Sequence, residues 1–386
     1  MKMLTWLIAL LLFQIELIHA TEAKKIRIAT TANVHGETDP CGWKKRPLGG
    51  LARKATIIDE MRSEGFDVII LDAGNLLFKK ENLGPGTPKE IAKSTAKIII
   101  SGFNEIGCAA FSPGSKDFAA GLSFVQEMQS ISNFPFISAN IHDVNGNRIF
   151  DPYVIVDSDS VSLGIIGLAS SFNHSEVFVQ DPIEVLSEFI NEVNAQVDIV
   201  VLLFDSEETD LTKLHASNLP IDLIVRSKAK TQSSDGGNKN IPAYSCGDRG
   251  KYVYQFDLHF TQPNVKFTDL SFHEKQISRS QQKLNKMKQG NLMTDLRTIY
   301  KEDPITLKKI DTYESQIQKS KNAIANGINT ITLKKHALDK NVLDRPDVLN
   351  LIDSEKSKRD ELYGPLPPSK GHKHLHDHNG DGVPDH

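Results

Sequence analysis

Polar side chains follow five apolar stretches of this 386-residue chain, at the point where each stretch ends. The loops carry imidazole, amide, carboxylate, hydroxyl and ammonium groups: Asn33 and His35, Asn75, Ser115 to Asp117, Asp205, and Lys228 with Lys230. Imidazole nitrogens and carboxylate or amide oxygens are ligands for divalent cations, whereas lysine ammonium groups donate hydrogen bonds to anions. If the five loops meet, they can therefore hold a metal ion or an anion.

The apolar stretches predict the sheets that would bring these loops together. They begin at Ile26, Val68, Ala109, Ile199 and Ile221. Continuous apolar strands indicate a sheet buried on both faces, and the carboxyl ends of such strands are where a layered α/β protein places its site. Residues 252–260 and 265–272 alternate apolar and polar positions, as an antiparallel hairpin would. We expect an α/β (α+β layered) sandwich of mixed sheets with helices on the outer faces.

Segments around these loops also match a known family in order and spacing. They are Asn33–Gly36, Gly49–Arg53, Leu71–Asn75, Gly107–Ala110 with Gly114–Phe118, and Ile224–Thr231. Together they resemble the secreted 5′-nucleotidase branch of the calcineurin-like metallophosphoesterases. The resemblance implies a four-layer β-sandwich flanked by helices over residues 21–273. For an active member it implies hydrolysis of phosphoric esters by two divalent ions.

The ligand positions that the resemblance implies are largely replaced in this chain. The family supplies an Asp and a His from the first loop, a bridging Asp from the second and an Asn followed by a His from the third. The fourth supplies one His and the fifth two. The corresponding residues here are Asn33, His35, Asn75, Ser115, Lys116, Asp205, Lys228 and Lys230, of which only His35 is unchanged.

These replacements predict that the pair of metal ions has been lost. An Asn carboxamide carries no charge, and a protonated Lys cannot ligate a metal. We therefore expect no cofactor in the core and no efficient hydrolysis, with Lys116 and Asp117 marking degenerate catalytic positions. The alternatives are a weakly active hydrolase with one ion on His35, Asn33, Asn75 and Asp205, and a binding or scaffold protein that acts through the C-terminal helical region and the tail.

The basic residues of the loops admit two interpretations. In the favoured one, Lys–Asp ion pairs with Asp39, Asp72, Asp117 and Asp205 replace the charge of the former metals. In the other, Lys116, Lys228, Lys230 and Arg53, with the helix start at Gly49-Gly50, bind phosphate or another anion. The net charge of −4 argues against a nucleic-acid or membrane-surface role.

Residues 1–20 have the pattern of a secretory signal peptide, with Lys2, an apolar run and a small-residue end at Ala20. We expect a periplasmic or secreted protein with no membrane anchor after cleavage. An oxidising compartment allows one disulfide, for which Cys41 and Cys246 are the candidate pair, while Cys108 is expected as a buried thiol.

The composition changes after residue 273, and the family's larger α/β domain is not matched there. Residues 274–363 predict a helical region, with helices starting at Asp303-Pro304 and Arg345-Pro346. It is either an appendage packed on the main domain, which is the favoured interpretation, or a partner-binding or oligomerising element.

Residues 364–386 form a Pro- and His-rich tail with the spacing of a calcium loop. Asp377, Asn379, Asp381 and Asp385 could bind Ca²⁺ around Gly382. The alternating His372, His374, His376 and His378 could instead bind a transition metal, or the tail could bind nothing. The sequence specifies neither a substrate nor an oligomeric state.

Overall fold

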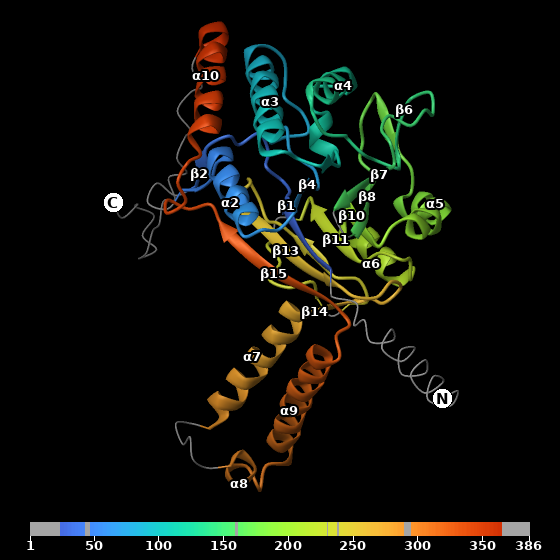
Figure 1. The fold of residues 1–386 in the computed structure, drawn as a ribbon, viewed down its shortest axis with the longest axis vertical. Coiled ribbons are helices and arrows are strands. Elements are labelled where there is room, and N and C mark those ends of the chain that lie inside the picture. The colour runs from blue at the N-terminus through green and yellow to red at the C-terminus, as the bar shows by residue number, and fades with distance from the viewer. Residues whose placement is uncertain are drawn as a thin grey trace, which may run out of the picture.

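The computed structural model describes residues 24–42, 47–158, 161–229, 231–237, 239–288 and 295–364. The predicted signal peptide, Lys230 and the tail after Gly364, with its candidate calcium and histidine ligands, lie outside the described residues. Two β-sheets form the centre of the molecule, and helices lie on both sides of them (Figure 1).

The first sheet has six strands in the order β14-β15-β13-β1-β4-β5. β1 is parallel to β4 and antiparallel to β13, while β15 lies between β13 and β14. The strands are β1 (Lys24–Thr31), β4 (Val68–Asp72), β5 (Ala110–Phe111), β13 (Tyr252–Phe260), β14 (Phe267–Asp269) and β15 (Asn329–Ala337).

The second sheet has five strands in the order β12-β11-β10-β8-β7, of which only β7 is antiparallel to its neighbour. They are β7 (Tyr153–Ser158), β8 (Val161–Ala169), β10 (Ile199–Asp205), β11 (Leu223–Ser227) and β12 (Ala243–Ser245). Two-stranded sheets pair β2 (Pro40–Cys41) with β3 (Leu48–Gly49) and β6 (Ile141–Asp143) with β9 (Val177–Val179).

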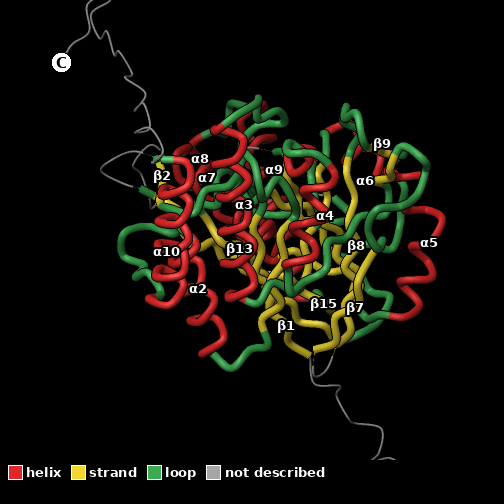
Figure 2. The backbone as a smooth tube through the Cα atoms, turned by 90° about the horizontal axis from the view of Figure 1, so that it is seen from above, coloured by secondary structure: helices red, strands yellow, loops and turns green. Residues whose placement is uncertain are grey.

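Helices cover the outer face of each sheet, as Figure 2 shows from above. On the first sheet they are α2 (Leu51–Ser63), α3 (Thr87–Ile106), α4 (Leu122–Ile131) and α10 (Pro346–Tyr363); on the second they are α5 (Pro182–Gln196) and α6 (Glu208–Ala216). Helix starts follow the sequence signals: the Asp181 carboxylate caps α5, and Pro88 and Pro346 lie in the first turns of α3 and α10.

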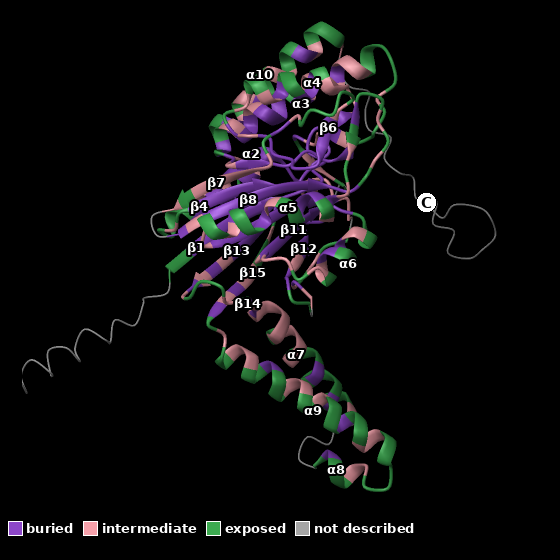
Figure 3. Ribbon diagram, turned by 90° about the vertical axis from the view of Figure 1, so that its right-hand side faces the viewer, coloured by how far each residue is buried: buried purple, intermediate pink, exposed green. Residues whose placement is uncertain are grey.

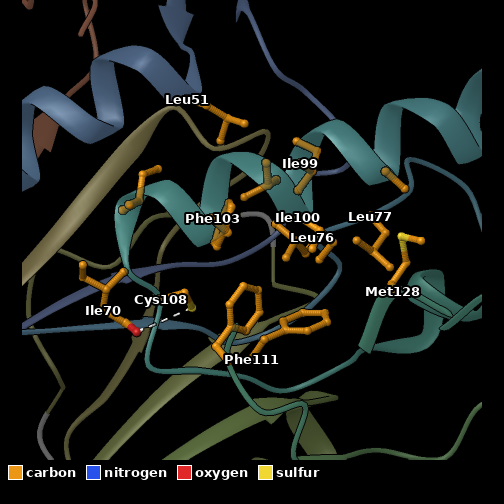
Figure 4. Close-up of a cluster of buried hydrophobic side chains, with 14 of the residues drawn as sticks. Leu51, Ile70, Leu76, Leu77, Ile99, Ile100, Phe103, Cys108, Phe111 and Met128 are labelled. Atoms are coloured by element: carbon orange, nitrogen blue, oxygen red, sulfur yellow. Dashed lines mark hydrogen bonds between the residues drawn. The ribbon is translucent and has the colours of Figure 1, made fainter. Parts of the chain in front are cut away.

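Buried apolar side chains fill three layers between these elements. One layer lies between the two sheets and includes Ile28, Leu71 and Leu203. A second packs α2, α3 and α4 against the first sheet, with Phe103 and Phe111 at its centre (Figure 4). A third lies under α5 and α6. The predicted layered α/β sandwich is confirmed.

The prediction for the C-terminal third is wrong in two respects. Residues 274–363 are not helical throughout, because they contain β15, which enters the first sheet. The predicted hairpin of residues 252–260 and 265–272 does not form, since β15 separates β13 from β14. Residues 270–272 begin a helix, which the Asp269 carboxylate caps. The sequence pattern showed which strands could form but not which strand would lie beside which.

Between β14 and β15 the chain forms a projecting helical arm, which we define as α7 (Leu270–Met287), α8 (Leu296–Ile299) and α9 (Pro304–Ala325). The arm extends away from the sheets (Figures 1 and 3). It has a small core of its own around Leu284, Leu296 and Ile310, separate from the three main layers.

All three cysteines are free thiols, so the expected Cys41–Cys246 disulfide is not formed. Cys246 is buried between the sheets, with its sulfur 3.4 Å from Thr30 Oγ1, whereas Cys41 lies half-buried in β2. Cys108 is a buried thiol, as predicted. Within the described ranges, no helix is both long enough and apolar enough to cross a membrane.

Candidate functional site

The predicted convergence of the loops is confirmed for those at the ends of β1, β4, β10 and β11. Asn33, Asn75 and Asp205 come from three of these loops, and their side chains join one buried hydrogen-bond network. The loop after β5 reaches the same network through the backbone of Ser115 and Lys116. The parallel strands place these loops at one edge.

We call the hydrogen-bonded side chains of Asn33, Asn75 and Asp205 the strand-end network, and Asn75 is at its centre. Its Nδ2 donates to Asp205 Oδ1 at 2.8 Å and to Asn33 Oδ1 at 3.3 Å, and its Oδ1 accepts from the Lys116 backbone N–H at 3.0 Å. Asn33 is equally committed, because its Nδ2 donates to the carbonyls of Ala229 and Gly247 and its Oδ1 also accepts from Lys228 N. In both carboxamides the nitrogen thus donates and the oxygen accepts hydrogen bonds within the protein.

Asp205 is completely buried, and both of its oxygens accept hydrogen bonds. Oδ1 accepts from the Ser227 hydroxyl at 2.7 Å as well as from Asn75, and Oδ2 accepts from the Ser115 backbone N–H at 2.9 Å. The carboxylate is therefore compensated by three neutral donors rather than by a cation. The Ser115 hydroxyl points elsewhere and lies 3.1 Å from Glu81 Oε1.

Asp117 supports the network from behind rather than facing a ligand. Its carboxylate accepts from the backbone N–H groups of Asn75, Leu77 and Gly114, at 2.7 to 2.8 Å. Burial raises the pKa of Asp117 to about 7, although the backbone donors stabilise the ionised carboxylate and act to lower the pKa. Asp117 is therefore a positioning residue for the second and third loops.

A buried basic residue that the sequence did not single out lies beneath the site. Lys54 Nζ donates to Thr31 Oγ1 at 2.8 Å and lies 3.7 Å from the centroid of the Phe103 ring. The Thr31 hydroxyl in turn donates to Asp72 Oδ2. Burial lowers the pKa of Lys54 to about 8 and raises that of Asp72 to about 6. Lys54 falls on the buried face of α2, where helical periodicity would have placed an apolar residue.

His35 contacts Asp248, which sequence reasoning also missed. His35 Nε2 is 3.0 Å from Asp248 Oδ1 and 3.4 Å from Lys116 Nζ. The hydrogen bond to His35 is the main cause that lowers the pKa of Asp248. His35 Nδ1 is buried and has no hydrogen-bond partner in the described structure. Asp248 follows β12 by only three residues, and this position after a strand was the available signal.

Two of the basic residues considered for ion pairing or anion binding have other partners than the aspartates that the sequence suggested, or lie apart from the network. Lys228 Nζ pairs with Glu207 Oε1 at 2.8 Å, not with an aspartate. Arg53 lies away from the network and faces Asp344 and the Leu338 carbonyl. Asp39 pairs with Lys356 of α10. Lys230 lies outside the described residues.

No protein-family model matches the sequence. The chain is 30% identical over 158 residues to the 5′-nucleotidase of Vibrio cholerae, covering 39% of this chain and 26% of the relative. It is 28% identical over 245 residues to the protein UshA of Salmonella pullorum, covering 59% of this chain and 43% of the relative. The chain thus spans less than half the length of these curated relatives.

Solved structures share the fold of this chain. The calcineurin-like phosphoesterase YfkN of Bacillus subtilis aligns with a TM-score of 0.61 over 88% of this chain and 99% of that chain, at 18% identity. This chain is similar in sequence to 5′-nucleotidases and shares the fold of a calcineurin-like phosphoesterase. A 5′-nucleotidase precursor from Thermus thermophilus aligns with a TM-score of 0.52 at 20% identity, over 61% of this chain and 52% of that one.

The residues of this chain do not fit the two divalent ions that the resemblance to 5′-nucleotidases implies. The oxygens of Asn33, Asn75 and Asp205 already accept hydrogen bonds from within the protein. The backbone of Gly114 also packs closely on two of these side chains, since a Cβ there would lie 2.8 Å from both Asn75 Oδ1 and Asp205 Cγ. In the ranges that the structure describes, no group of three or more His, Cys, Asp and Glu side chains could hold a metal ion.

Proposed function

We propose that this chain is an exported 5′-nucleotidase-like protein that does not hydrolyse phosphoesters through a pair of metal ions. The observation that carries the proposal is the Asn75 carboxamide, which joins Asn33 and Asp205 in a closed hydrogen-bond network. Metal-assisted hydrolysis needs charged ligands and an open coordination position for water. Neutral donors saturate the Asp205 carboxylate, so this network supplies neither.

Metal content and activity of the chain without its tail test this proposal together. We expect residues 21–364 to carry well below one equivalent of manganese, zinc or iron. We also expect no release of phosphate from nucleoside monophosphates at saturating Mn²⁺ or Zn²⁺. Two equivalents of metal in the purified protein, or hydrolysis that a chelator abolishes, would overturn the proposal.

Restoring the family's ligands provides the matching positive test. The restored variant carries Asn33→Asp, Asn75→Asp, Ser115→Asn, Lys116→His, Asp205→His, Lys228→His and Lys230→His. It should gain affinity for divalent ions, because carboxylates and imidazoles replace the amides and ammonium groups. The matched control is the same variant with Asn75 retained, which lacks the bridging carboxylate. Equal metal affinity in the two variants would contradict this assignment.

The weakly active alternative places one ion on His35, Asn33, Asn75 and Asp205. Of these side chains, only His35 offers a buried nitrogen without a partner, which is too little to hold a catalytic ion. Chelator-sensitive hydrolysis that disappears in His35→Ala would favour this alternative.

Export is the proposed localisation, and it rests on the pattern of residues 1–20. We expect the mature protein in the periplasmic or secreted fraction, with Thr21 as its first residue. Recovery of the protein in the cytoplasmic fraction with Met1 or Lys2 retained would contradict export.

Binding of a protein partner through the arm is a second candidate function. The start of α9 exposes Ile305, which retains 71% of its accessible surface, beside Lys308 and Lys309. An exposed large apolar residue beside two lysines suits an acidic partner with an apolar residue of its own. A binding partner captured by the full chain should be lost with Ile305→Asp but retained with Lys301→Asp, an exposed position before α9.

A further inference from the structure

A second polar pocket lies on the outer side of the second sheet, apart from the strand-end network. It is about 380 Å³ in volume and opens between α6, the loop after β11 and the first turns of the arm. The residues that matter to its chemistry are His215, Arg226, Ser233, Asp235, Lys275 and Arg279. Arg226 and Ser227 are neighbours on β11, but Ser227 bonds to Asp205, whereas the Arg226 side chain contacts Ser206 and Glu208.

Three cationic side chains, Arg226, Lys275 and Arg279, line this outer pocket. Arg226 is buried to 6% exposure and is fixed by the Ser206 hydroxyl at 2.7 Å and by Glu208 Oε1 at 2.8 Å. Lys275 Nζ lies 2.7 Å from Asp235 Oδ2. Arg279, one helical turn further along α7, forms no ion pair with any acidic residue in the described part of the chain.

The one carboxylate that lines the pocket is already neutralised. Asp235 accepts from Lys275, from the Ser234 hydroxyl at 3.2 Å and from the Gly237 backbone N–H at 3.1 Å. These bonds lower the pKa of Asp235 despite its partial burial, so the carboxylate stays ionised and paired at neutral pH. Arg226 is paired with Glu208 and Lys275 with Asp235, so Arg279 carries the surplus positive charge of the lining.

The loop that forms one wall is held in place without a ligand. Ser233 Oγ accepts from Ser245 N at 2.9 Å, the Ser233 carbonyl accepts from the Tyr254 hydroxyl, and Gly236 N donates to Asp269. His215 Nε2 lies 3.1 Å from the Ile241 carbonyl and so donates to it, which leaves Nδ1 as an acceptor. A preformed wall reduces the entropy that binding must overcome.

We propose that the outer pocket binds a phosphate group, free or carried on a small molecule. Arg279 and Lys275 supply charge-assisted hydrogen bonds to the phosphate oxygens. The guanidinium of Arg226, which Glu208 and Ser206 hold in place, lines the same pocket. The volume exceeds that of a phosphate ion, so a small phosphomonoester also fits. The site is independent of the strand-end network and of the proposed loss of hydrolysis.

Calorimetry on the intact protein tests the proposal, with inorganic phosphate and glycerol phosphate as the two probes. At least one probe should bind in a 1:1 ratio, and sulfate should compete with it. A tighter constant for glycerol phosphate would identify an ester as the natural ligand, and equal constants would identify free phosphate. Absence of binding by both probes at millimolar concentrations would overturn the proposal.

Three variants locate the binding. Arg279→Ala, on an exposed helix position, should weaken it by about tenfold or more, because a hydrogen bond to a charged group contributes about that much. Lys283→Ala is the matched control, since its Nζ lies 4.9 Å from the centroid of the Tyr313 ring and outside the pocket. Lys228→Ala removes a cation of the strand-end network. Affinity that falls with Lys228→Ala but not with Arg279→Ala would place the anion at the strand ends and refute the outer pocket.

Discussion

Asn75 has a backbone φ of 54°, in the left-handed region that non-glycine residues seldom adopt. Asn33, His35 and Lys228 share this conformation with φ values of 53°, 60° and 68°. Asparagine tolerates the left-handed region better than most residues, whereas lysine does not. The loops therefore keep a shape that costs energy, and the hydrogen bonds of the two asparagines offset that cost.

Asn75→Asp tests whether the network depends on the amide donor. The new carboxylate would face Asp205 Oδ1 across the present 2.8 Å contact, so we expect the free energy of unfolding to fall by about 2–4 kcal/mol at pH 8. Repulsion between two facing carboxylates raises the pKa of one of them in the folded state. As the pH falls toward 5, the folded state therefore binds a proton that the unfolded state does not. The loss should therefore shrink toward pH 5. Urea unfolding at both pH values measures it.

Asn82→Asp is the control for this substitution, because Asn82 is exposed and its side-chain oxygen only accepts from Gly84 N. It should change stability by less than about 0.5 kcal/mol. Full rescue of Asn75→Asp by Mn²⁺ or Zn²⁺, without further substitutions, would mean that the remaining side chains still hold metals.

Asp117→Asn tests the buried carboxylate through pH. Because burial raises the Asp117 pKa from 3.8 to about 7, its contribution to stability is greatest below pH 4 and is lost as pH rises to 7. The variant lacks this titration. Between pH 4 and pH 7, the free energy of unfolding of the unmodified protein should therefore fall by roughly 2–4 kcal/mol more than that of Asp117→Asn.

The comparison is made by urea unfolding at each pH, and Asp311→Asn, at an exposed position on the arm, serves as the control. Parallel pH profiles for the unmodified protein and Asp117→Asn would mean that the backbone donors, rather than burial, set the Asp117 pKa. The variant is also expected to be less stable overall, because an amide N–H₂ would face a backbone N–H donor.

At the scale of elements, the parallel strands were the most predictable part of the molecule. Val68–Asp72 and Ile199–Asp205 are continuous apolar runs, and each is buried along its whole length. Their carboxyl ends meet, as the apolar pattern and the topology of α/β sheets require. The contacts of Asn33, Asn75 and Asp205 follow from that geometry.

The partners of the basic residues were not predictable in the same way. Lys228 reaches Glu207 and Arg53 reaches Asp344, and these choices depend on side-chain direction at the loop and helix surfaces. β15 was missed because Ile331 and Leu333 are its only large apolar residues, and six of its nine residues are polar or basic. Its burial comes from its neighbours in the sheet rather than from its own composition.

Shortening the arm tests whether its core is independent of the main layers. In this variant a four-residue Gly–Asn turn replaces residues 281–314, which removes Leu284, Leu296 and Ile310 but keeps the Ser280–Gln316 contact at the base. The free energy of unfolding of the main domain should change by no more than about 1 kcal/mol, because no main-layer side chain is lost. Circular dichroism and calorimetry measure the shift.

Leu203→Ala is the contrasting variant for the shortened arm. Leu203 is fully buried between the sheets, and its truncation should cost about 2–5 kcal/mol. If the shortened arm destabilises the protein as much as Leu203→Ala does, the arm and the sheets unfold as one unit.

For the whole molecule, the tail remains a separate question from the folded core. We propose that Asp377, Asn379, Asp381 and Asp385 bind Ca²⁺ with a dissociation constant of about 10⁻⁴ to 10⁻³ M, as single extracellular modules do. Calorimetry on the full chain and on residues 21–364 measures it. Binding in both proteins would move the site to the core, and binding of Ni²⁺ or Zn²⁺ alone would favour the four tail histidines.

The position of β15 also governs when the protein can finish folding. β13 pairs with β1 on one side and with β15 on the other, and β15 is separated from β13 by the whole arm. A growing chain that has not yet reached residue 337 leaves one edge of β13 open, with its N–H and C=O groups unpaired and able to pair with another chain. Late closure of a distant contact is slow. During synthesis, this edge is therefore where a chaperone would act and where aggregation would begin.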